Sequence, residues 1–143
     1  MIKPIPGIIP IYGDLSYRDK KCPRESIEQI TLITRLRNQY PETYGRVVIH
    51  AKNEQRLING QFQSITKDKA MGLSVGASDI IIPGASTFVC ELKRQDASLC
   101  KIHDEQIEYL LAAKNTGSFV CVALGCESAW QAFNEWREIN EKT

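Results

Sequence analysis

The sequence has no apolar run long enough to cross a bilayer, because charged residues or glycines interrupt each hydrophobic stretch. It also lacks a Walker-type phosphate loop, the GxGxxG fingerprint of dinucleotide-binding proteins and any internal repeat. We therefore expect no membrane partner, and neither a nucleotide-binding fold nor a repeat array is indicated.

The five cysteines lack the paired spacing of zinc ligands, and their number is odd. Cys121 lies inside an apolar run, and no second pair accompanies Cys121 and Cys126, which disfavours structural zinc. No secretory leader is recognised at the beginning of the sequence, so we expect a reduced cytoplasmic setting.

The chain has little net charge, +1 from 18 basic and 17 acidic residues. This balance does not exclude nucleic acid as a partner, because binding depends on where the positive charge lies rather than on its total. The length of 143 residues and a hydrophobic content of 43% are those of one ordinary globular domain.

Hydrophobic periodicity and turn residues divide the chain into short elements. We predict an extended basic arm over residues 1–24, helices over 26–40, 61–71, 102–114 and 129–139, and strands over 47–50, 79–82, 88–93 and 119–124. Gly76, just before the strand that starts at residue 79, predicts a sharp turn or a close backbone approach. Strands interspersed with helices indicate an α/β fold with a mixed sheet.

The two central strands form a hairpin whose turn contains Pro83 and Gly84. A five-residue loop over residues 83–87 sets the register, pairing Ile82 with Phe88, Ile81 with Val89, Ile80 with Cys90 and Asp79 with Glu91. Side chains alternate across a strand, so one face of this hairpin is apolar and the other carries Asp79, Glu91 and Lys93. Two carboxylates that face each other repel unless a cation lies between them, and a hard divalent cation suits oxygen ligands.

Asp79, a gap of eleven residues and then Glu91-Leu92-Lys93 resemble the PD-(D/E)XK nuclease signature. The wider context resembles the VRR-NUC group of that superfamily, in phage or bacterial stand-alone form. This likeness extends over residues 50–56, which read His-Ala-Lys-Asn-Glu-Gln-Arg, over residues 69–76, over Gln106 and over residues 117–122. In one departure, Ser78 stands where the family usually has proline, which affects backbone stiffness rather than a ligand.

The resemblance implies a restriction-endonuclease-like core over residues 25–143 and a metal-dependent DNA endonuclease in a bacterial or phage-infected cell. Asp79, Glu91 and the backbone carbonyl of Leu92 would bind Mg²⁺, with Mn²⁺ able to substitute. Lys93 would position the attacking water and Gln106 would support that geometry. Glu28, in the first turn of the first helix, would complete the metal site, and Glu54 competes with it for that role.

Binding to DNA is expected to use phosphate contacts, because no recognition helix, zinc finger or aromatic platform is evident. The residues expected to make these contacts are Arg56, Lys67, Lys69 and Arg94, with a contribution from the basic arm. Stand-alone relatives resemble Holliday-junction resolvases, which implies a homodimer and a branched substrate by analogy. Two alternatives stay open: a nucleic-acid-binding protein that keeps the fold without cleaving, and a structural or assembly protein in which the three charged residues form an ion-pair network.

Overall fold

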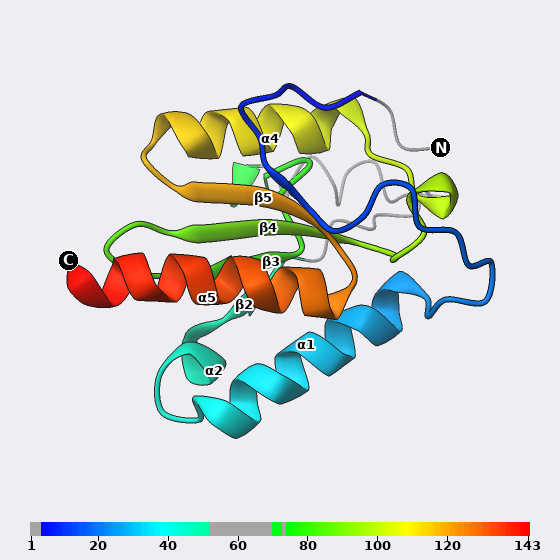
Figure 1. Cartoon of the computed structure of the whole chain (residues 1–143). Coiled ribbons are helices and arrows are strands. Elements are labelled where there is room, and N and C mark those ends of the chain that lie inside the picture. The colour runs from blue at the N-terminus through cyan, green and yellow to red at the C-terminus, as the bar shows by residue number, and fades with distance from the viewer. Residues whose placement is uncertain (1–3, 52–69, 73) are drawn as a thin grey trace.

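The computed structural model describes residues 4–51, 70–72 and 74–143, which build a mixed five-stranded sheet with helices on both faces (Figure 1). Its strands are β1 (Ile11–Tyr12), β2 (Ile49–His50), β3 (Ile80–Ile82), β4 (Phe88–Lys93) and β5 (Phe119–Leu124). Their order is β1-β5-β4-β3-β2; the β1–β5 and β5–β4 pairs are parallel, and the other two pairs are antiparallel. The α/β fold class predicted from the sequence is confirmed.

The helices form two layers around the sheet (Figure 1). They are α1 (Glu25–Gln39), α2 (Tyr44–Val47), α4 (Asp104–Asn115) and α5 (Cys126–Lys142), together with the 3₁₀ helix η1 (Ala97–Leu99). Helices α1 and α5 cover one face, where a larger core includes Leu32, Phe133 and Trp136. Helix α4 covers the other face, where Leu110 and Val89 belong to a smaller core. No helix in the described ranges is long and apolar enough to cross a membrane.

The central hairpin has the predicted register, with Ile80 opposite Cys90, Ile81 opposite Val89 and Ile82 opposite Phe88. The predicted apolar face is also confirmed, because Ile80, Ile82, Phe88, Cys90 and Leu92 all lie in the larger core. β4 then lies between two partners, with β3 on one side and β5 on the other. Residues 88–90 of β4 are paired on both sides, whereas its charged end, residues 91–93, is paired with β5 and lies beside the residue that leads into β3.

The N-terminal segment is more ordered than the sequence predicts. Residues 11–12 form β1, which adds a parallel edge strand to β5, and Ile9 is buried in the smaller core. Apart from residues 11–12, the described residues 4–24 form no helix or strand, and β1 leaves no local signal because its pairing partner β5 is more than 100 residues away in sequence.

Several element boundaries differ from the predictions. The strand predicted over residues 47–50 is reduced to β2, since Val47 ends the short helix α2, and Ile49 is exposed rather than part of the core. Helix α5 begins three residues earlier than predicted, and α4 begins two residues later. Residues 61–69 of the helix predicted over 61–71 lie outside the described residues.

Candidate metal and phosphate site

Asp79 lies one residue before β3, where the hairpin register places it opposite Glu91 on β4. Its Oδ2 accepts a hydrogen bond of 3.0 Å from the backbone N–H of Leu92. In a strand the N–H and C=O of one residue point to the same side, so the carbonyl of Leu92 is also directed toward the Asp79 strand. Local hairpin geometry therefore gathers three of the four groups predicted as metal ligands, Asp79, Glu91 and the carbonyl of Leu92.

Glu91 is fully buried, although it carries a carboxyl group. Its Oε1 accepts a hydrogen bond of 2.8 Å from Gln106 Nε2 on α4 and lies 3.4 Å from Lys93 Nζ. Its Oε2 is buried and, while Glu91 is ionised, has no hydrogen-bond partner among the described residues. A buried polar atom without a partner is costly, so this oxygen indicates a ligand position.

The environment favours the protonated form of Glu91. Burial raises the pKa of Glu91 to about 9, and the charge of Asp79 adds to this rise, while Lys93 opposes it. Burial also raises the pKa of Asp79, against the opposing effects of a hydrogen bond from Glu91 and the charge of Lys93. Both shifts favour protonation of the pair, at the place where a cation would neutralise both carboxylates.

The donor set fits a hard divalent cation such as Mg²⁺. Two facing carboxylates, one of them with an unpartnered oxygen, and a backbone carbonyl are the oxygen ligands that such a cation prefers. Within the part of the chain that the structure describes, no group of three or more His, Cys, Asp or Glu side chains is arranged around a common point. The remaining positions would accordingly belong to water and substrate oxygens, as is usual for Mg²⁺.

A pocket of about 870 Å³ opens beside these groups. Asp79, Lys93 and Gln106, three residues predicted at the site, line it, so the structure brings them together. Lys93 is buried except for its contribution to this wall, with 4% of its surface exposed. Gln106 occupies the third position of α4, where its Oε1 also accepts from the backbone N–H of His103, which fixes the amide against Glu91.

Glu28 is not among the residues that line this pocket. It is buried on the core side of α1, where its Oε2 accepts a 2.8 Å hydrogen bond from the N–H of Cys126 and Gln95 Nε2 lies 3.3 Å from its Oε1. The geometry thus uses Glu28 to cap the N-terminus of α5. Glu25, one turn earlier on α1, lines the pocket instead, together with Gln29.

Arg94 also has a different position from the one predicted. Its guanidinium donates to the backbone carbonyls of Pro23, at 3.1 Å, and Cys22, at 2.7 Å. These bonds hold the end of the arm against β4, which makes Arg94 a structural anchor rather than an open phosphate contact. Arg56, Lys67, Lys69 and the alternative carboxylate Glu54 lie outside the described residues.

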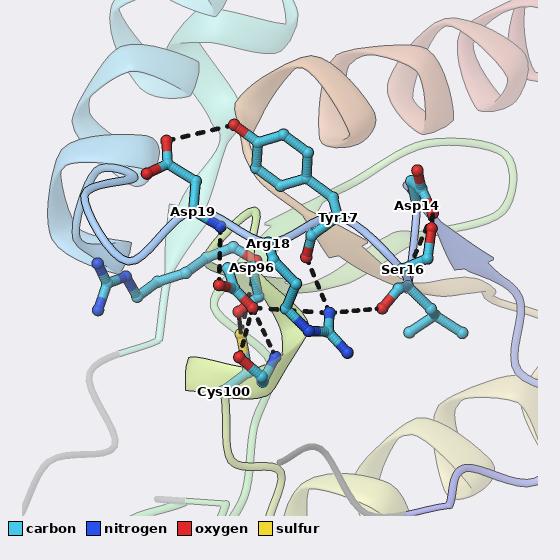
Figure 2. A network of polar contacts seen from close by, with 10 residues as sticks. Asp14, Ser16, Tyr17, Arg18, Asp19, Asp96 and Cys100 are labelled. Atoms are coloured by element: carbon cyan, nitrogen blue, oxygen red, sulfur yellow. Dashed lines mark hydrogen bonds and ion pairs between the residues drawn. The ribbon is translucent and has the colours of Figure 1, made fainter.

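A second anchor holds the arm at Asp96, which is buried (Figure 2). Its carboxylate accepts hydrogen bonds from the backbone N–H of Asp19 and from the N–H and hydroxyl of Ser98, and Arg18 lies 3.7 Å away. The hydrogen bonds from Ser98 contribute most to a lowered pKa of Asp96. These contacts fix the backbone of the arm shortly before Arg24, which lines the pocket.

Sequence reasoning left His50 out of the site, but the structure places it in the pocket wall. Its Nδ1 lies 3.0 Å from the carbonyl oxygen of Asp79, so Nδ1 carries the hydrogen and donates it. The pairing of β2 with β3 brings these residues together, with His50 opposite Ile80. The signal available in the sequence was the position of His50 in the segment that resembles the VRR-NUC group.

Comparison with known proteins identifies structural similarity but no sequence relative. No protein-family model matches the sequence, and no curated protein matches it. A solved structure described as a VRR_NUC domain protein has a similar fold, with a TM-score of 0.64 and 18% sequence identity, over 80% of this chain and 88% of that chain. The fold is therefore that of a VRR_NUC domain protein, and it extends over most of both chains.

Proposed function

We propose that this protein is a Mg²⁺-dependent DNA endonuclease that hydrolyses phosphodiester bonds. The observation that carries the proposal is the buried pair of facing carboxyl groups: Asp79 lines the pocket, and Glu91 lies behind it with an unpartnered oxygen. The fold shared with a VRR_NUC domain protein supports it. Desolvating two adjacent acids costs stability, and a bound cation that neutralises both would offset this cost.

The divalent cation, when bound, would lower the pKa of a water molecule and neutralise charge on the scissile phosphate. Asp79, Glu91 and the carbonyl of Leu92 would hold it. Lys93 lines the pocket at the end of β4, where its ammonium group would hold the attacking water or a phosphate oxygen. Gln106 keeps the Glu91 carboxyl group in place through its 2.8 Å hydrogen bond, so it acts as a positioning residue.

The test is cleavage of supercoiled plasmid, linear duplex, flapped and four-way DNA in the presence of Mg²⁺ or Mn²⁺. We expect Asp79→Asn and Glu91→Gln to abolish cleavage while both variants stay folded. Glu138→Gln, an exposed position on α5, is the matched control and should cleave like the parent. Cleavage that survives both site substitutions, or no cleavage of any DNA with either metal, would overturn the proposal.

The same panel tests the preferred substrate and assembly. By analogy with junction resolvases, we expect the four-way DNA to be cut faster than the linear duplex, by a homodimer. Light scattering of the free and DNA-bound protein measures the oligomeric state. Equal rates on all four substrates would remove the preference for branched DNA and leave the nuclease activity in place.

A further inference from the structure

Two cationic residues line the pocket without forming an ion pair with Asp79 or Glu91. Arg24 and Lys101 both line it, and both are exposed. Lys93 is paired with Glu91, whereas neither Arg24 nor Lys101 makes an ion pair with any of the residues that the structure describes. We propose that Arg24 and Lys101 bind the backbone phosphates on either side of the scissile phosphate, an inference that rests on the proposed nuclease function.

The two cations come from opposite layers of the fold. Arg24 is the N-cap residue of α1, which lies on the face with the larger core. Lys101 lies between η1 and α4, and α4 covers the face with the smaller core. The sheet, with Lys93 at the end of β4, lies between these layers (Figure 1). A polyanion that crosses the pocket from one layer to the other therefore meets a cation on each side of the acidic pair.

Both cations are attached to anchored backbone. Arg94 binds the carbonyls of the two residues immediately before Arg24. Cys100, immediately before Lys101, is buried, and its thiol donates to the carbonyls of Arg94 and Asp96 at 3.5 and 3.3 Å. The backbone of each cation is thus fixed while its side chain stays exposed, which lowers the entropy lost when a phosphate is bound.

Acidic residues in the pocket wall restrict where a polyanion can bind, so its position depends on the two cations. Glu25 and Glu105 also line the pocket, so its positive charge is confined to a few positions. A polyanion would be repelled by these carboxylates unless its phosphates lie against Arg24 and Lys101. Two separate cations around a pocket of about 870 Å³ suit an extended nucleic-acid backbone better than a single phosphate group.

The inference is tested by binding, separately from cleavage. A short fluorescent duplex is titrated by anisotropy with Glu91→Gln protein in EDTA at several salt concentrations. The slope of log K against log salt should flatten by about 0.9 for Arg24→Gln and for Lys101→Gln, and by about 1.8 for the double variant. Arg24→Lys and Lys101→Arg should restore the slope. Lys114→Gln, exposed at the other end of α4, is the matched control and should not change it.

Cleavage by the two variants separates this inference from the proposed function. In protein that keeps Glu91, Arg24→Gln and Lys101→Gln should raise KM more than they lower kcat. Low salt should recover part of the lost cleavage rate. Unchanged slopes in a protein that cleaves DNA would overturn the phosphate contacts and leave the nuclease intact. Flattened slopes in a protein that cleaves no DNA would support the phosphate contacts and overturn the proposed nuclease function. Equally strong binding of a mononucleotide competitor would show that the pocket takes a single phosphate.

Discussion

Glu91→Gln should stabilise the metal-free protein at alkaline pH and have little effect at acidic pH. Glutamine keeps an acceptor for Gln106 and Lys93 at the Oε1 position. It replaces the unpartnered Oε2 with an amide that can donate to Asp79, as the protonated Glu91 does. The variant therefore mimics the protonated form of Glu91 at every pH.

The magnitude follows from the pKa of Glu91, which burial raises from 4.5 to about 9. Between these values the folded state binds more protons than the unfolded state, so the contribution of Glu91 to the stability of the parent falls as pH rises from 4.5 and reaches its minimum above 9. Each pH unit in this window costs about 1.4 kcal/mol, which sets a ceiling of about 5 kcal/mol at about pH 8. Because Asp79 shares the proton, we expect a gain on the order of 2 kcal/mol for the variant, or about 5 °C in Tm.

The assay is thermal unfolding followed by circular dichroism in EDTA, from about pH 5 to about pH 9. The difference in Tm between Glu91→Gln and the parent should grow steadily with pH. Glu138→Gln, on the exposed side of α5, removes one carboxylate without touching the pair and should show a constant difference. A pH-independent difference for Glu91→Gln, or a variant less stable than the parent at the alkaline end, would refute the reasoning.

Three further predictions concern neighbouring residues. Lys93→Ala should leave Mg²⁺ binding measurable by calorimetry while lowering kcat at least tenfold, about 1.4 kcal/mol; loss of metal affinity with the rate would show that Lys93 holds the site together. Glu28→Ala should lower the free energy of unfolding by about 2 kcal/mol, because it removes a charged acceptor from the N-terminus of α5; parent-like stability in urea unfolding would contradict this capping role. Gly76→Ala should destabilise the protein by more than about 1 kcal/mol and slow cleavage, because a Cβ there would overlap the carbonyl of Glu105; parent-like stability and rate would show that α4 can move away from residue 76 without loss of free energy of unfolding.

The hairpin could be predicted from the sequence because its information is local. Period-two alternation and a Pro-Gly turn set both the register and the apolar face, and the pairing of Ile80, Ile81 and Ile82 with β4 is confirmed. The parallel contacts of β4 with β5 and of β1 with β5 have no comparable signal, since their partners are joined by long crossovers. This is why the fold class was predictable and the edge strand in the arm was not.

Glu28 illustrates an error in choosing a helix face. Hydrophobic spacing predicted the helix over residues 26–40, and only the family resemblance placed Glu28 at the metal site; Ile27 and Ile30 are exposed at 51% and 61%. The buried line is Glu28, Leu32 and Leu36, at intervals of four residues, so Glu28 points along the core-facing side. The line of Glu25 and Gln29 faces the pocket. A glutamate in the first turn suits the helix dipole at either position, so the residue type alone could not decide between them.

The burial of Glu91 and Lys93 was beyond sequence reasoning, which treated the charged side of the hairpin as a polar face. Their face begins with Val89, which packs in the smaller core under α4, and the same helix extends over Glu91 through Gln106. The start of α4 can approach this closely because Gly76 has no side chain and adopts a φ of 77°. Tertiary packing thus converts an ordinary pair of strand carboxylates into a desolvated pair with raised pKa values. A cation that displaces the shared proton would relieve this electrostatic cost, so the packing that destabilises the metal-free site would favour the metal-bound one.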